Sequence, residues 1–170
     1  MDVERKKTKI FERLQTVKDP EIPVISVVEL GMIEDIVMHD DCILIKVLPT
    51  FLGCPAIDMI KDNLIQAVEA MGDRAEVEFI YAPPWTSDRI TKEGREKLKK
   101  FGIAPPPAPP FRQGQWTVAC PYCESLHTVL ENVFGPAACR SMLYCKACKN
   151  PFEAMKPIFQ KEREYHSCSK

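Results

Sequence analysis

The sequence predicts an α+β protein in two parts, and three observations lead to this prediction. Over the first 104 residues, the hydrophobic patterns follow the order helix, β-hairpin, helix, strand and helix. Five prolines follow within residues 105–110. Two Cys-x-x-Cys pairs, Cys120/Cys123 and Cys145/Cys148, then lie in a tail with few large apolar residues. The predicted division is a domain at 1–104, a proline-rich linker at 105–110 and a four-cysteine module at 111–170.

The composition, 45% hydrophobic and 28% charged, is typical of a globular protein. The net charge of -1 gives no bulk attraction to nucleic acid or to anionic membranes, so neither is an expected partner. No run approaches the roughly 18 apolar residues of a membrane span, and the charged first residues lead into no apolar signal core. We therefore expect a cytoplasmic protein, in which paired cysteines bind metal or carry out redox reactions more often than they form structural disulfides.

The first helix is predicted at residues 4–18. Ile10, Leu14 and Val17 share one face of this segment, and lysine and arginine side chains fill much of the rest. The run Asp-Pro-Glu-Ile-Pro at 19–23 ends the helix, because the residue before a proline is disfavoured in the helical region.

Three strands are predicted next. Residues 24–28 fit either a short strand or a helical turn, and this alternative stays open. Residues 32–38 and 42–49 are rich in isoleucine and valine, and the His-Asp-Asp run between them favours a hairpin turn. Residues 75–81 alternate polar and apolar side chains, as a strand with one buried face does.

Two further helices complete the first domain. Residues 55–71 place six apolar side chains on one face, and Pro55 suits the first helical position. A helix at about 91–101 is predicted to begin at Thr91 as the N-cap and to end near Gly102.

The tail cysteines predict a zinc-ribbon-like metal site. Cys123 and Cys145 have 21 residues between them, which is close to the spacing of a zinc ribbon. Each Cys-x-x-Cys turn points two thiolates at one centre, and two such turns complete a tetrahedron. Four protein ligands leave no open coordination position, which favours a structural metal, and zinc, iron or an iron–sulfur cluster all stay open. Cys139 and His127 also stay open as substitute ligands.

Cys54 is the second cysteine feature. It precedes Pro55 in the loop that joins a predicted strand to the second helix. Free N–H groups at the start of a helix favour a thiolate, so we interpret Cys54 as a reactive thiol. The alternative is an ordinary buried cysteine. Asp19, Glu21 and Thr50 are the polar residues that we expect to converge on this loop.

Several runs of the sequence resemble a known family. The first domain resembles the metal–sulfur cluster biosynthetic domain of SufT-like proteins at residues 19–23, 29–33, 50–55 and 81–86. The tail resembles one branch only, the PaaD proteins encoded with the phenylacetyl-CoA epoxidase system of bacterial phenylacetate breakdown, at residues 120–123, 134–140 and 145–153.

This resemblance implies an α+β domain, a zinc-ribbon-like tail and an accessory role in the ring-1,2-epoxidation of phenylacetyl-CoA. The sequence has no di-iron, flavin or CoA motif, so we expect no catalytic residues and a role in maturation. The resemblance implies that Cys54 is a transient ligand for iron or an iron–sulfur cluster, with Asp19, Glu21 and Thr50 shaping its loop. It also implies that the four tail cysteines bind metal.

The expected partners are the oxygenase and reductase subunits of the epoxidase, with the iron–sulfur assembly machinery as a further one. Two alternatives to maturation stay open. One is an electron-transfer subunit whose tail holds a reducible metal centre, and the other is a structural adaptor that docks partners through its zinc ribbon.

Overall fold

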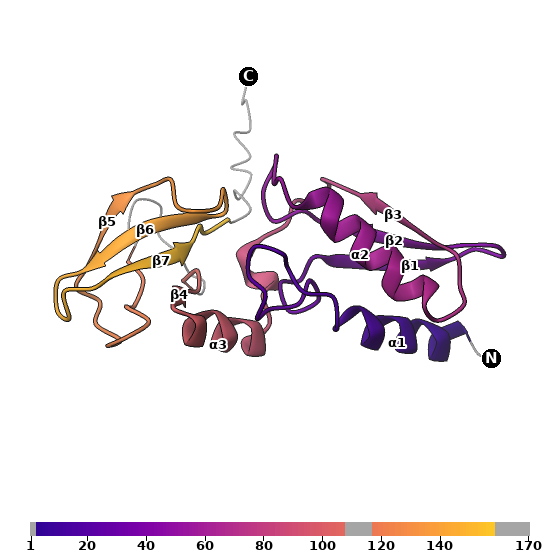
Figure 1. Ribbon diagram of the computed structural model, residues 1–170, viewed down its shortest axis with the longest axis horizontal. Helices are drawn as coiled ribbons and strands as arrows, with labels where there is room; N and C mark the ends of the chain where they lie inside the picture. Colours follow the sequence, from indigo (N-terminus) through magenta and orange to yellow (C-terminus); the bar gives the residue numbers. More distant parts are fainter. Residues whose placement is uncertain (1–2, 108–116, 159–170) are drawn as a thin grey trace, which may run out of the picture.

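A computed structural model of the protein describes residues 3–107 and 117–158. Two parts lie next to each other along the long axis, a larger part that combines helices with a three-stranded sheet and a smaller, four-stranded part (Figure 1). The predicted α+β class is confirmed. The first part contains the strands β1 (Ile33–Met38), β2 (Ile43–Val47) and β3 (Ala75–Phe79).

The three strands form one mixed sheet in the order β1-β2-β3. The predicted hairpin joins β1 and β2, and at its turn the amide of His39 donates a hydrogen bond to the carbonyl of Cys42 (2.9 Å). β3 runs parallel to β2. Ile36, Ile45 and Val77 are in register across the three strands and are all buried, so one face of the sheet faces the core.

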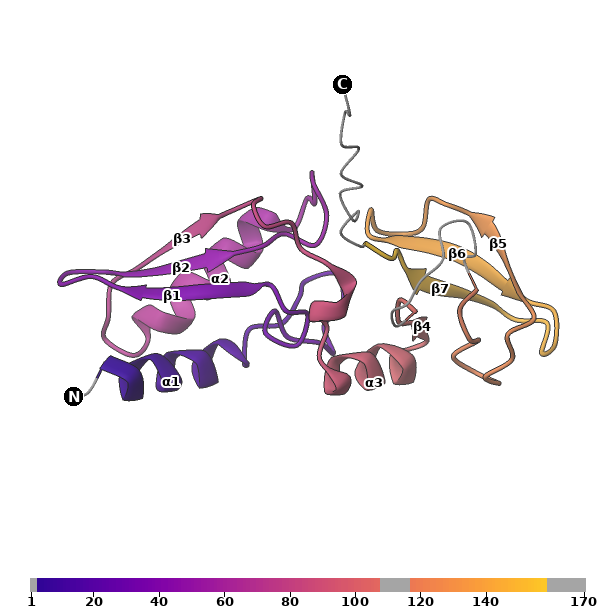
Figure 2. The same ribbon diagram turned by 180° about the vertical axis from the view of Figure 1, so that it is seen from behind.

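The helices of the first part are α1 (Val3–Leu14), α2 (Ile57–Glu69) and α3 (Lys92–Phe101), with a 3₁₀ turn, η1 (Ser87–Arg89), before α3. α2 covers one face of the sheet, because it lies in front of the strands in Figure 1 and behind them in Figure 2. In the described ranges, no helix is both long enough and apolar enough to cross a bilayer.

Two helix boundaries differ from the prediction, and one is confirmed. α1 ends at Leu14 rather than at residue 18, because the amides of Thr16 and Val17 bond to carbonyls three residues back and tighten the last turn. α2 begins at Ile57, so Pro55 lies before the helix and not at its first position. Thr91 caps α3 as predicted, since its side chain accepts a hydrogen bond from the amide of Gly94 (3.0 Å).

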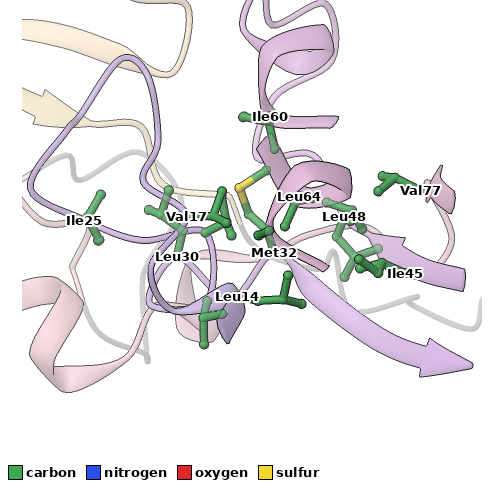
Figure 3. Packing of buried hydrophobic residues seen from close by; sticks show 14 of the residues in the cluster. Leu14, Val17, Ile25, Leu30, Met32, Ile45, Leu48, Ile60, Leu64 and Val77 are labelled. Atoms are coloured by element: carbon green, nitrogen blue, oxygen red, sulfur yellow. The ribbon is translucent and has the colours of Figure 1, made fainter. Parts of the chain in front are cut away.

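The core of the first part gathers side chains from α1, the loop after it, β2 and α2 (Figure 3). Leu14, Ile45 and Leu64 are fully buried there. Met32 and Leu30 come from the loop and lie in the same cluster. The loop between α1 and β1 is therefore part of the core and is held in place by it.

Two residues of the resembling runs fix this loop from the other side. Trp85 is buried, and its indole N–H donates to the carbonyl of Leu30 (2.8 Å). Gly31 has a φ of +68°, and a Cβ there would lie 2.3 Å from the carbonyl oxygen of Arg89. Only glycine fits this close approach. These positions are therefore structural supports for the loop that contains Asp19.

The second part is a four-stranded sheet in the order β4-β7-β6-β5, built from β4 (Ile103–Ala104), β5 (Thr128–Asn132), β6 (Arg140–Cys145) and β7 (Pro151–Met155). Gly102 is the only residue between α3 and β4, and β4 pairs in parallel with β7. The chain therefore enters the second sheet before the proline-rich run. The predicted division at residues 104 and 111 stays a prediction, and residues 108–116 lie outside the described residues.

Candidate functional site

The first candidate residue, Asp19, closes the turn that follows α1. Its carboxylate is buried and accepts hydrogen bonds from the amides of Glu21 (2.8 Å) and Ile22 (2.9 Å). Burial raises the pKa of Asp19, and these two hydrogen bonds oppose the rise. The loop thus holds a carboxyl group in a place where its negative charge is poorly solvated.

Cys54 lies in the loop between β2 and α2, half-buried against the main core. Burial raises the pKa of its thiol, and the charges of Asp19 and Glu21 raise it further, while the backbone N–H of Ala56 acts in the opposite direction. The expected stabilisation of a thiolate by the helix start is therefore wrong. α2 begins three residues later, and burial with two nearby carboxylates outweighs the N–H group. A metal ion at Cys54 has to displace the thiol proton.

The structure thus brings Asp19, Glu21 and Cys54 within electrostatic reach of one another. Thr50 is buried nearby in sequence but contributes to a different feature. It lines an apolar cavity of about 330 Å³ together with Phe51 and Trp85. The Thr50 side chain therefore lies in the wall of a cavity that borders the Cys54 loop.

The four predicted metal ligands of the tail lie together. All four sulfur atoms are within 4.8 Å of one another. The sulfurs of Cys120 and Cys148 are 3.7 Å apart, and those of Cys123 and Cys145 are 3.6 Å apart. A tetrahedral zinc ion with bonds of about 2.3 Å holds its sulfur ligands roughly 3.8 Å apart. The side chains present therefore fit a tetrathiolate metal site.

The two Cys-x-x-Cys turns have the same backbone geometry. Glu124 and Lys149 each follow the second cysteine of a pair, and each has a φ of 62°. Each also donates its amide proton to the carbonyl of the first cysteine of its pair, at 2.9 Å in both turns. Within residues 3–107 and 117–158, this group includes neither Cys139 nor His127, the two alternative ligands.

The second part reaches the first beside the Cys54 loop. Arg140 is buried, and its guanidinium lies 2.5 Å from the carboxylate of Glu153 and 3.8 Å from that of Glu21. Lys156 donates its side-chain proton to the carbonyl of Ala138 (2.8 Å), and its ammonium lies 5.4 Å from the ring centre of Phe51.

Cys139, the residue before Arg140, is the thiol whose surroundings the sequence did not indicate. It is half-buried, and burial raises its pKa to about 11. Arg140 lowers this pKa, whereas Asp19 and Cys54 raise it, so the thiol lies within electrostatic reach of both. Its membership of the run at 134–140, quoted for the resemblance of the tail, was the available signal, but a sequence does not show that this run faces the first part.

Known protein families match both parts of the chain. Residues 7–79 match the family described as iron-sulfur cluster assembly protein, and residues 104–156 match the PaaD zinc beta ribbon domain. Among solved structures, a domain of unknown function, DUF59, from Bacillus anthracis is similar with a TM-score of 0.52 and 24% identity. This similarity covers 56% of this chain and 92% of that chain, and it shows the shared fold of the first part.

Curated relatives extend the match to the whole chain. The Fe-S protein maturation auxiliary factor YitW of Bacillus subtilis (strain 168) is 33% identical over 54% of this chain and 92% of its own length. A protein of Escherichia coli (strain K12), named as one of the subunits of a putative 1,2-phenylacetyl-CoA epoxidase, is 34% identical over 88% of this chain and 92% of its own length. The chain therefore belongs to the PaaD family, whose members are named as subunits of 1,2-phenylacetyl-CoA epoxidase.

Proposed function

We propose that this protein is a maturation factor that carries iron or an iron–sulfur cluster at Cys54 and delivers it to the oxygenase or reductase of the phenylacetyl-CoA epoxidase system. The observation that carries the proposal is the position of the Cys54 thiol. It lies within electrostatic reach of two carboxylates from a separate loop. Relatives of the first part are named as Fe-S protein maturation auxiliary factors, which supports the same role.

The properties of Cys54 suit transient binding. The free thiol keeps its proton at neutral pH because burial and the nearby carboxylates raise its pKa. Cargo binding then breaks the S–H bond, forms a metal–sulfur bond and releases a proton. Because a single thiolate is a weak holder of metal compared with a closed four-ligand site, Cys54 can pass its cargo to a client that offers more ligands.

The tail has a different role in this proposal. Its four thiolates leave no open position, so the metal there is structural, and we infer zinc because the sulfur spacing suits a tetrahedral zinc ion. The metal organises the second part and so places Arg140 and Lys156 beside the Cys54 loop.

The test uses the client proteins. The oxygenase and reductase subunits are produced in cells that also contain the wild type, Cys54→Ser or Cys42→Ser, and are purified without oxygen. Cys42 is the matched control, because it is also a half-buried free cysteine but lies next to the β1–β2 hairpin turn. We expect clients with less iron or acid-labile sulfide only from the Cys54→Ser cells.

Full metal content in clients from Cys54→Ser cells would overturn the proposal. If loss of Cys145 then disabled the system while Cys54→Ser was silent, the structural adaptor would be the better explanation. The metal content and visible spectrum of the purified wild-type protein address the electron-transfer alternative, because one zinc per chain and no reducible centre would exclude it.

A further inference from the structure

The seam between the two parts holds a second cysteine next to the Cys54 loop. Cys139 lies immediately before β6, and both of its neighbours are fixed. On one side, Arg140 donates to the backbone carbonyl of Glu21 (3.5 Å) and pairs with its carboxylate. On the other side, the carbonyl of Ala138 accepts a hydrogen bond from the Lys156 ammonium (2.8 Å). Cys139 is therefore anchored between two contacts.

These anchors connect the Cys139 segment to both loops of the thiol site. Glu21 belongs to the Asp19 loop, and Phe51, whose ring lies under the Lys156 ammonium, belongs to the Cys54 loop. The amide of Lys156 also donates to the carbonyl of Cys139 itself (2.8 Å). One short stretch of the second part thus contacts the two loops that supply the candidate residues of the first.

The surroundings of Cys139 also suit a charged ligand set. Arg140 is buried beside it, and the Nε of its guanidinium is the one buried side-chain donor without a hydrogen-bond partner among the described residues. A thiolate or carboxylate that moved within reach would satisfy this donor. The positive charge also offsets the negative charge that two thiolates near Asp19 would accumulate.

We propose that Cys54 and Cys139 together form a two-thiol site for a thiophilic metal ion, with one ligand from each part of the chain. The inference rests on the proposed function, because it names the second ligand of the cargo site. When the ion binds, two S–H bonds break, two metal–sulfur bonds form and two protons leave to solvent.

The site closes only when the ion arrives. Among the described residues, the four tail cysteines are the one gathered set of three or more candidate ligands, so Cys54 and Cys139 have to move together without a third ligand already in place. The Cys54 loop has room for this movement. Gly53 has a φ of +80°, and no heavy atom lies within 4 Å of the position of a Cβ there.

The test is a cobalt titration of the full chain, loaded first with one equivalent of zinc to occupy the tail and kept reduced without oxygen. We expect the wild type to bind one further Co²⁺ with an intense thiolate-to-cobalt absorption band. Cys54→Ser and Cys139→Ser should each weaken the band and lower the Co²⁺ affinity at least about tenfold. Cys42→Ser should behave like the wild type. A full band in Cys139→Ser would overturn the inference.

A second measurement needs no variant and covers the case in which Cys139→Ser does not fold. Dibromobimane links two neighbouring thiols, and it is applied to the zinc-loaded wild type before peptide mapping. We expect Cys54 joined to Cys139 as the main product. Capture of each thiol alone, with no joined peptide, would contradict the site.

The client assay separates the two proposals. If Cys54→Ser lowers the metal content of the clients and Cys139→Ser does not, the second ligand is wrong and the maturation role stands. If neither variant lowers it, the maturation role itself fails.

Discussion

The guanidinium of Arg140 lies 3.8 Å from the carboxylate of Glu21, although the two residues are 119 positions apart in the chain. The same guanidinium pairs with Glu153 of the adjacent strand β7. One buried side chain therefore joins the second sheet to the loop that contains Asp19. The zinc-ribbon-like part is in this way a neighbour of the thiol site and not a distant appendage.

The first prediction concerns this contact. Arg140→Met keeps the aliphatic packing but leaves Glu153 and Glu21 without their partner. We expect the free energy of unfolding of the zinc-loaded protein to fall by about 2 kcal/mol in denaturant titrations. The control is Arg74→Met, because Arg74 pairs with Glu76 on the surface and should lose at most about 1 kcal/mol. Equal losses in the two variants would contradict the structural role of Arg140.

The second prediction concerns the metal in the tail. The core of the second part has seven buried residues, and two of them are the ligands Cys120 and Cys145. Cys145→Ser, or removal of the metal with a chelator, should therefore unfold β5, β6 and β7 and leave β1, β2 and β3 folded. Hydrogen exchange followed by peptide gives this comparison directly, with Cys42→Ser as the control. Exchange protection retained in β6 after metal loss would show that the small core is sufficient.

The third prediction separates function from stability at Asp19. Burial raises the pKa of this carboxyl, so the fold disfavours its charged form, and its contribution to stability is lost as the pH rises from its ordinary value of 3.8 through the raised pKa. Asp19→Asn removes the charge and keeps an oxygen that accepts both amides. We expect equal or higher stability at neutral pH, with clients that lack metal.

The matched variant is Asp19→Ala, which also removes the acceptor of two hydrogen bonds. It should lose about 1–2 kcal/mol of unfolding free energy at neutral pH and should also fail in maturation. Thermal and denaturant unfolding of both variants, together with iron analysis of the clients, make the comparison. Normal client iron with Asp19→Asn would remove this carboxylate from the functional site.

The fourth prediction is a pH profile for Cys54. Burial and the charges of Asp19 and Glu21 raise its pKa above the ordinary value of 9.0, so the thiolate that reacts with iodoacetamide forms only at higher pH. In the zinc-loaded protein, the alkylation rate of Cys54 should still be rising above about pH 9. The stabilisation linked to the protonated thiol is present below about pH 9 and is lost as the pH rises through the raised pKa.

Mass spectrometry of the Cys54 peptide measures this rate, and the same peptide in the urea-unfolded chain is the control. The unfolded control should level off near the ordinary value. A folded profile that levels off no higher than the unfolded one would mean that the helix start stabilises the thiolate after all.

Much of the first part was predictable because its signals are local. The apolar period gave α2 within two residues at each end, and Thr91 and Gly102 marked the ends of α3. The tail spacing likewise predicted the four-sulfur group, because two Cys-x-x-Cys turns can point at one centre whatever lies between them.

The rest depended on contacts between distant segments. β4 is two residues long and carries no period of its own, so its pairing with β7 had no signal in the sequence. Cys139 and Arg140 were placed within the tail, because nothing local indicates that they face Glu21. The protonated state of Cys54 was also missed, since it depends on burial and on carboxylates from another loop.

The two-residue strand β4 has a consequence for how this protein can change over time. Since β4 follows α3 after Gly102 alone and pairs with β7, the last helix of the first part already sets the direction in which the second sheet begins. The proline run comes after this pairing and has no orientation left to determine. We therefore expect that this run can lengthen or shorten without tilting the ribbon, whereas a single inserted residue between α3 and β4 would turn every strand that follows.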